Sequence, residues 1–348
     1  MIDLTGRQQR IIALITSEGR LSISQIKELL QESISQPTLN RDLAKLVKNN
    51  FLAKTGKARA ITYTISDFYV LFAEIDIEVY FTKDPDNRDV LEHFNYELFE
   101  VLEKVEIFSA KENGLLESLK QEYQANIASI SPILYNKEME RLTIELSWKS
   151  AQIEGNTYSL LETEKLFLER ESAKNKTKEE ATMLLNHKDA LEYLLQHKNL
   201  AEKLNLQVVE VVHSLLIKGL EVGKNIRKRG VGITGTAYKP IDNEFQIKEY
   251  LEKMCLLINA KENGFEKALL AIVFISYIQP FEDGNKRTGR MIGNALLIAH
   301  NACPLSYRSV DSIDYKKAML LFYEQNNLSV FKQLFIEQNE LGVKNYFR

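Results

Sequence analysis

The chain has 348 residues, of which 45% are hydrophobic and 27% are charged, and its formal net charge is −3. These proportions are typical of a globular protein of about two domains and exclude extensive disorder or collagen-like repeats. Its two cysteines, Cys255 and Cys303, cannot build a disulfide framework or a cysteine-based zinc site. The longest apolar run, 268–278, is too short to span a bilayer, and the N-terminus has no signal-peptide pattern. We therefore expect a cytoplasmic protein with no membrane partner.

Basic residues are concentrated near the N-terminus. Residues 1–66 contain ten Lys or Arg and five Asp or Glu, which gives +5 and leaves −8 for the remaining residues. A basic segment joined to an acidic body indicates two different roles. We predict a first domain over 1–66, a helical connector packed on the body over 67–129, and a second domain over 130–348.

The basic segment has the pattern of three helices followed by two strands. The spacing of apolar residues and the capping residues predict helices over 7–17 and 22–30 and a third that opens at 35–38. Strands are predicted over 51–54 and 60–65, with a basic turn at 55–59. The stretch SQPTLNRDLAKLVKNNFLAKTGKARAITYTI resembles the recognition helix and wing of a winged helix-turn-helix of bacterial regulators.

This resemblance implies that the third helix enters a major groove and that the wing contacts phosphates of duplex DNA. The expected groove-facing residues are Ser35, Gln36, Thr38, Asn40 and Arg41, with Lys57 and Arg59 on the wing. The open alternative is a docking or dimerisation module with an ordinary basic surface. A palindromic operator would require a homodimer.

The connector carries no recognisable chemistry. Segment 68–80 is apolar and partly β-branched, which fits either a strand or the start of a helix, and longer helical patterns cover 90–105 and 115–124. A turn cluster, KDPDNRD, separates them at 83–89.

The strongest chemical signal is QPFEDGNKRTGR at 279–290, between an apolar helix predicted over 269–278 and a helical run over 288–300. Gly284 allows a tight turn, so that amide groups can converge at the next helix N-terminus, which is an anion site. Arg287 and Arg290 share a helix face and can bind a polyphosphate together. Asp283 lies where a carboxylate can hold Mg²⁺ jointly with phosphate oxygens. The pattern predicts a binding site for nucleotide phosphates.

This string closely resembles the Fic-domain motif, His-Pro-Phe-x-Asp/Glu-Gly-Asn-Gly/Lys-Arg-x-x-Arg. Two other segments are similar to parts of the same family. SAQIEGN at 150–156 resembles its inhibitory motif, and GKNIR at 223–227 followed by 231–240 resembles its Gly-x-x-x-Arg turn and β-hairpin flap. The resemblance implies a mainly α fold: a helical bundle with a small hairpin flap, to which the winged helix is appended. It also implies ATP and Mg²⁺ as ligands and transfer of AMP to a hydroxyl side chain of an unknown target protein.

The resemblance assigns roles to particular positions. Asp283 would hold Mg²⁺, Arg287 would contact the phosphate chain, and Arg290 would bind the γ-phosphate. An anion hole would be formed by Gly284, Asn285 and the Lys286 backbone. The inhibitory helix, at about 137–155, would contribute Ser150, Glu154 and Gly155, and Glu154 would occupy Arg290 at rest. The flap, at about 231–240, would align a target strand through Ile233, Thr234, Gly235, Thr236 and Tyr238.

Gln279 departs from the family pattern, which has His at this position. That His accepts the proton of the target hydroxyl, and Gln has no titratable nitrogen. Three interpretations are open: a natural nucleotide-binding pseudoenzyme, an enzyme with reduced or altered activity that uses another base, and an engineered inactive variant. The catalytic positions implied by the family are those of Gln279, Asn285 and Arg287. We expect His187 and His213 to be structural rather than replacement bases.

Two other functions compete with a self-inhibited AMP transferase. The chain can be a transcription regulator in which the second domain senses nucleotide and the winged helix binds an operator. It can also be a docking protein, which predicts no ATP binding.

Overall fold

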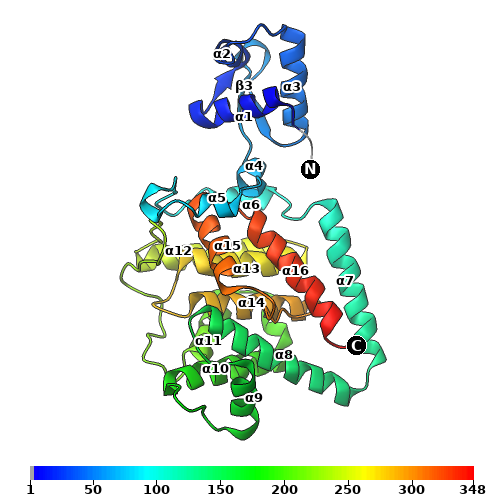
Figure 1. Ribbon diagram of the computed structural model, residues 1–348, viewed down its shortest axis with the longest axis vertical. Coiled ribbons are helices and arrows are strands. Elements are labelled where there is room, and N and C mark those ends of the chain that lie inside the picture. The colour runs from blue at the N-terminus through cyan, green and yellow to red at the C-terminus, as the bar shows by residue number, and fades with distance from the viewer. Residues whose placement is uncertain (1–3) are drawn as a thin grey trace. The chain divides into compact units, whose positions relative to one another are not determined.

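The computed structural model describes residues 4–348, apart from the side chains of Arg59, Asn199 and Ala201. The chain divides into two compact units (Figure 1). The first comprises Met1–Ile75 with Asn326–Ser329, and the second comprises Asp76–Gln325 with Val330–Arg348.

The first unit contains four helices and a three-stranded antiparallel sheet in its described residues. The elements are α1 (Gly6–Glu18), β1 (Leu21–Ser22), α2 (Ile23–Leu29), α3 (Gln36–Lys48), β2 (Leu52–Thr55), the 3-10 turn η1 (Ala58–Ala60), β3 (Thr62–Ile65) and α4 (Asp67–Phe72). The strand order is β1-β3-β2, with Leu21 opposite Tyr63 and Leu52 opposite Ile65. The three predicted helices and two predicted strands are confirmed to within a few residues.

Capping residues and a small apolar core hold this unit together. Ser22 and Gln25 form a reciprocal capping box at the start of α2, and the Ser35 hydroxyl accepts from the Thr38 amide at the start of α3. Buried leucines of α3 pack against buried isoleucines of α1 and α2. The buried carboxylate of Asp42 accepts a hydrogen bond from Gln8, which ties α3 to α1.

The second unit is a helical bundle. Its elements are α5 (Ile77–Tyr80), η2 (Pro85–Asn87), α6 (Leu98–Lys104), α7 (Ala110–Ser129), α8 (Pro132–Ile153), α9 (Leu160–Glu169), α10 (Lys178–Gln196), η3 (Lys198–Ala201), α11 (Leu206–Leu216), α12 (Glu244–Ala260), α13 (Gly264–Ile278), α14 (Asn285–Ala299), α15 (Ser312–Gln325) and α16 (Ser329–Asn345). The mainly helical fold is therefore confirmed. No helix in the described part of the chain is long and apolar enough to cross a membrane.

Helices α13 and α14 lie at the centre of this unit, with α15 and α16 on one side and α8, α10 and α11 on another (Figure 1). Residues 268–278 of α13 are all buried. Glycines on α14 permit its close approach: a Cβ on Gly289 would lie 2.9 Å from the Ile272 carbonyl oxygen, and one on Gly293 would lie 2.6 Å from the Ile272 side chain. This close packing sets the distance between the end of α13 and the start of α14, which residues 279–284 join.

The connector differs in part from its predicted structure. Segment 68–80, which fitted either a strand or the start of a helix, forms the short helices α4 and α5, capped by Ser66 and Asp76. The helix predicted over 90–105 is wrong in its extent and covers only Leu98–Lys104. The reason is that Leu91 and Glu92 use their backbone groups to bind other parts of the chain.

The predicted hairpin over 231–240 is also wrong, because the structure forms an extended loop with a turn in this segment. Its Lys239 amide donates to the Glu92 carbonyl at 2.7 Å, and Lys239 forms an isolated parallel bridge with His93. Tyr238 is buried, and its hydroxyl donates to the Tyr277 carbonyl at 2.9 Å. These long-range contacts take the place of strand pairing within the segment.

Candidate functional site

A short loop between α13 and α14, together with the first turns of α14, carries the residues predicted to bind phosphates. Gln279 ends α13 with a left-handed φ of 51°, and Gly284, with a φ of 82°, precedes the first residue of α14. The Asn285 side chain closes the loop, because its Oδ1 accepts from the Phe281 amide at 2.9 Å and its Nδ2 donates to the Phe281 carbonyl at 2.8 Å. Phe281 is fully buried and stacks on His213 with ring centroids 3.6 Å apart. The loop is thus anchored in the core.

Asp283 presents a carboxylate at the start of α14. Its Oδ1 accepts from the Gly284 amide at 2.6 Å, and its Oδ2 accepts from Arg287 Nη2 at 2.8 Å. The Asp283 side chain is 62% exposed, whereas that of Arg287 is 1% exposed. The Nε and Nη1 atoms of Arg287 are buried without a hydrogen-bond partner. An exposed carboxylate therefore lies beside a buried cation with unused donors.

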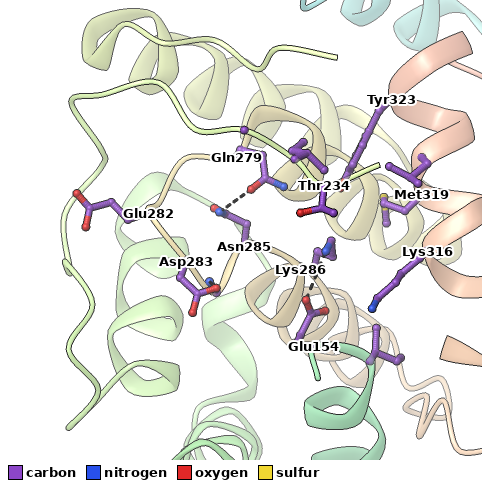
Figure 2. Close-up of a pocket in the computed structure, with 15 residues that line it drawn as sticks. Glu154, Thr234, Gln279, Glu282, Asp283, Asn285, Lys286, Lys316, Met319 and Tyr323 are labelled. Atoms are coloured by element: carbon purple, nitrogen blue, oxygen red, sulfur yellow. Dashed lines mark hydrogen bonds and ion pairs between the residues drawn. The ribbon is translucent and has the colours of Figure 1, made fainter. Parts of the chain in front are cut away.

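The last turn of α8 supplies an acceptor for the second arginine of the motif. Glu154 caps α8, and its Oε1 accepts from Arg290 Nη2 at 2.9 Å. Lys286 Nζ lies 3.4 Å from the other oxygen, Oε2 (Figure 2). Burial raises the pKa of the Glu154 carboxyl, but the charges of Arg290 and Lys286 outweigh this effect, so the pKa lies below its ordinary value. Glu154 is therefore ionised and bound to two cations at neutral pH.

The inhibitory segment predicted at about 137–155 is the C-terminal part of α8, which begins earlier, at Pro132. Ser150 lies one turn before Glu154, and its Oγ accepts from Arg290 Nε at 2.9 Å. Gly155 follows with a φ of 99°, a left-handed conformation that glycine adopts without strain. The structure therefore brings Ser150, Glu154 and Arg290 together.

Gln279 lies next to Asn285 and has both ends of its amide engaged. Its Oε1 accepts from Asn285 Nδ2 at 2.8 Å (Figure 2), and its Nε2 donates to the Ser276 carbonyl at 2.7 Å. Its main-chain oxygen accepts from Arg227 Nε at 2.6 Å, so Arg227 supports the loop. With 9% of its surface exposed, Gln279 is buried, and its amide joins Asn285 to the last turn of α13.

Two histidines lie near the motif, and both hold main-chain groups. His187 is fully buried, and burial lowers its pKa to about 3. Its Nδ1 lies 2.8 Å from the Met183 carbonyl oxygen. Burial likewise lowers the pKa of His213 to about 4, and its Nε2 lies 3.0 Å from the Asp283 carbonyl oxygen. These contacts agree with the structural role predicted for both residues.

A cavity of about 390 Å³ opens over the loop. Its walls combine the motif, the end of α8, the 231–240 loop and one face of α15 (Figure 2). The residues that line it are Ile153, Glu154, Gly232, Ile233, Thr234, Gln279, Glu282, Asp283, Gly284, Asn285, Lys286, Lys316, Met319, Leu320 and Tyr323. Sequence reasoning missed the four residues of α15. These four residues are spaced so that they share one face of a helix, which the sequence does show. That spacing does not distinguish a helix face that lines a cavity from one that packs in the core.

Several predicted site residues lie outside the cavity walls. Arg287 and Arg290 are buried beneath them, with 1% of each side chain exposed. Of the flap residues, Ile233 and Thr234 line the cavity, whereas Gly235 and Thr236 do not. Tyr238, predicted to face a target, is a core residue stacked on Tyr277 at 4.8 Å.

The residues predicted to contact DNA gather on the N-terminal half of α3. Ser35, Gln36, Asn40 and Arg41 are exposed, and Thr38 is half-buried. Ser35 Oγ and Thr38 Oγ1 lie 2.8 Å apart. Lys57 is exposed in the turn after β2, and the Arg59 side chain lies outside the described residues.

Two segments of the chain match families of known proteins. Residues 203–297 match the Fic/DOC family, and residues 7–63 match a DeoR-like helix-turn-helix domain. The Fic/DOC match includes the 279–290 motif, and the helix-turn-helix match precedes it along the chain. The segment that contains Glu154 lies outside both matched ranges.

Solved structures of Fic proteins share the fold. A Fic domain containing signaling protein from Bacteroides thetaiotaomicron is 18% identical with a TM-score of 0.56, and the alignment covers 66% of this chain and 96% of that chain. A Fic family protein from Desulfovibrio desulfuricans is 16% identical with a TM-score of 0.57, over 69% and 74% of the two chains. Residues 134–508 of Fic-1 from C. elegans are 16% identical with a TM-score of 0.57, over 98% of each chain.

Proposed function

We propose that this chain is a Fic-type ATP-binding protein that Glu154 holds in a self-inhibited state. Its reaction would be transfer of AMP from ATP to a hydroxyl side chain of a target protein, with pyrophosphate as the leaving group. The Fic/DOC match supports the class of protein. The observation that carries the proposal is the ion pair between partly exposed Glu154 and buried Arg290, 2.9 Å apart, at the edge of the cavity.

The residues at the cavity fit a magnesium nucleotide. Buried Arg287 and Arg290 retain donor nitrogens without partners, and the amide groups that open α14 favour an anion. Asp283 would hold Mg²⁺ together with phosphate oxygens, and the metal would neutralise phosphate charge. Arg290 is the cation for the terminal phosphate, but a carboxylate that occupies it at rest competes with that phosphate.

Gln279 compromises the transfer step. The acceptor hydroxyl must lose a proton as it attacks the α-phosphorus, and loss of a general base costs about 10²- to 10⁴-fold in rate. The Gln279 amide cannot accept that proton, and both of its ends are hydrogen-bonded. We therefore propose that this chain retains nucleotide binding but has lost most of its transfer activity.

Isothermal titration with ATP tests the binding function. The Glu154→Gly chain should bind ATP in a magnesium-dependent manner. Adding Asp283→Ala should remove that magnesium dependence, because the carboxylate beside the phosphates is lost. Absence of ATP binding to the Glu154→Gly chain would refute the proposal and favour a docking protein.

A second candidate function is favoured by the DeoR-like match and by the exposed polar face of α3. In this case the chain is a DNA-binding regulator in which the Fic/DOC domain senses nucleotide. Binding to a random-sequence duplex should weaken with salt, and Lys57→Ala should lower the salt slope by about 1. A slope unchanged by Lys57→Ala would exclude this phosphate contact. The same substitution at the exposed Lys248 of α12 is the control.

A further inference from the structure

A buried chain of hydrogen bonds joins Arg290 to His187 through Ser150. Arg290 Nε lies 2.9 Å from Ser150 Oγ, and Ser150 Oγ lies 2.9 Å from His187 Nε2. His187 Nδ1 in turn lies 2.8 Å from the Met183 carbonyl oxygen. Ser150, His187 and Arg290 are each no more than 1% exposed, so water cannot replace these partners.

The donors and acceptors available fix which atom donates in each of these hydrogen bonds. The Met183 carbonyl can only accept, so His187 Nδ1 carries a hydrogen. Burial lowers the pKa of His187 to about 3, and the neutral ring therefore leaves Nε2 as an acceptor. Ser150 must then donate its hydroxyl hydrogen to His187. A lone pair of Ser150 Oγ is thereby directed at Arg290 Nε, which can only donate.

Most of the contacts that orient Arg290 do not involve Glu154. Besides the Nε bond to Ser150 Oγ, Arg290 Nη2 donates to the Ser150 carbonyl at 2.9 Å. The Tyr315 ring lies 5.1 Å from the guanidinium carbon. Glu154 accepts from Nη2, and Nη1 is buried without a hydrogen-bond partner. When Glu154 is lost, Ser150 therefore still holds Nε and Nη2 of Arg290. The hydrogen of Nη2 that Glu154 accepted becomes free.

We propose that Ser150 and His187 are positioning residues that hold Arg290 ready for a terminal phosphate, independently of Glu154. This inference rests on the proposed ATP-binding function and changes the role assigned to Ser150. Although Ser150 belongs to the same segment as the inhibitory Glu154, it supports nucleotide binding rather than preventing it. Substitutions of the two residues should therefore have opposite effects.

Titrations with ATP and AMP separate the two roles. In the Glu154→Gly chain, adding Ser150→Ala should weaken ATP binding by about ten- to a hundredfold, because a buried bond to a charged group is lost. AMP, which lacks the terminal phosphate, should bind both chains equally. If Ser150→Ala instead tightens ATP binding, as we expect for Glu154→Gly, the proposal is overturned. Equal losses for ATP and AMP would also overturn it, since they indicate general damage to the site.

The orientation of Arg290 can be measured without any nucleotide. Its Nε–H signal in a nitrogen-15 NMR spectrum is assigned by its absence from the Arg290→Lys chain. Exchange of this hydrogen with solvent should be slow in the unmodified and Glu154→Gly chains and at least tenfold faster after Ser150→Ala. The positioning role would be refuted if Ser150→Ala leaves the exchange rate unchanged. It would also be refuted if Glu154→Gly alone accelerates exchange, even if ATP binds.

Two substitutions of His187 test the second positioning residue. His187→Gln keeps a side-chain oxygen that can accept from Ser150, so Nε–H exchange should remain slow. His187→Leu removes the acceptor and should accelerate exchange. Equal Nε–H exchange rates in both variants would show that His187 does not help to position Arg290. If the Glu154→Gly chain binds no ATP but these exchange rates follow the prediction, the proposed function fails and the positioning of Arg290 stands.

Discussion

Glu154 at the end of α8 and Arg290 on α14 are 136 residues apart in the chain, yet Oε1 of one lies 2.9 Å from Nη2 of the other. Arg290 is buried and Glu154 is 19% exposed at the cavity wall. The carboxylate can therefore leave toward the cavity, whereas the guanidinium cannot. This asymmetry makes Glu154 the movable member of the pair.

Glu154→Gly should tighten binding of ATP, because Arg290 loses its competing carboxylate. We expect about a tenfold gain or more, measured by isothermal titration, since bonds to charged groups contribute about 1.5–3 kcal/mol. AMP affinity should change little. Glu282 lines the same cavity, so Glu282→Gln is the matched control. A similar gain from Glu282→Gln would indicate a general charge effect rather than release of Arg290.

Acid should not release this ion pair under mild conditions. The pKa of Glu154 lies below its ordinary value of 4.5, so the pair is fully present above pH 4.5 and is lost only as the pH falls through the lowered value. We therefore expect Glu154 to contribute nothing to the pH dependence of ATP affinity between about pH 6 and 8, so the unmodified and Glu154→Gly chains should show the same pH dependence. A gain on acidification in the unmodified chain that Glu154→Gly abolishes would show that Glu154 titrates in this range.

His187 should make the protein less stable in acid. Its pKa is about 3 in the folded chain against an ordinary value of 6.5, so the unfolded chain binds the extra proton between these values. The free energy of unfolding should then fall by up to about 1.4 kcal/mol for each pH unit below roughly 6.5. In the His187→Gln protein, the free energy of unfolding should lack this fall between about pH 7 and pH 5, as measured by urea unfolding. Parallel pH dependence in the two proteins would show that His187 titrates normally.

A fully buried ion pair elsewhere in the helical bundle should matter for stability. Arg88 lies 3.1 Å from Glu324 at the end of α15, and their side chains are 3% and 0% exposed. Arg88 also donates to the Gly235 carbonyl, and Tyr80 donates to Glu324 at 2.7 Å. Arg88→Met should reduce the free energy of unfolding by about 3–5 kcal/mol, because Glu324 is left charged and unpaired.

The double variant Arg88→Met, Glu324→Gln is the control for this pair. It removes both charges, so urea unfolding should show a smaller loss than Arg88→Met alone. An equal or larger loss would mean that packing, rather than the unpaired charge, accounts for the effect.

Local patterns predicted the parts of the fold that depend on neighbouring residues. Ser22 and Ser35 predicted helix starts because capping acts within one turn. The 279–290 motif was found for the same reason, since its glycine, carboxylate and arginines are close in sequence. The predicted pairing of Glu154 with Arg290 came from resemblance to a family motif, because no local pattern relates positions so far apart.

Tertiary contacts explain what sequence reasoning missed. Lys316 and Tyr323 join the cavity only because α15 packs beside α13, and nothing in their own segment indicates chemistry. The predicted hairpin failed because burial of Tyr238 and the bond from Lys239 to Glu92 outweigh local strand pairing. The link from Ser150 to His187 was missed because it joins α8 to α10.

The most direct test of the proposed function places a histidine at position 279. Three chains are compared: Glu154→Gly alone, Glu154→Gly with Gln279→His, and Glu154→Gly with the non-titratable Gln279→Asn. Each is incubated with ATP and Mg²⁺ and followed by intact-mass spectrometry. With a hydroxyl of the chain itself standing in for the target, we expect covalently attached AMP in the Gln279→His chain, formed at a rate at least about 100-fold above that of the other two. Equal rates in all three would show that position 279 does not limit transfer. Absence of an adduct from all three would contradict the transferase account and favour the nucleotide-sensing regulator.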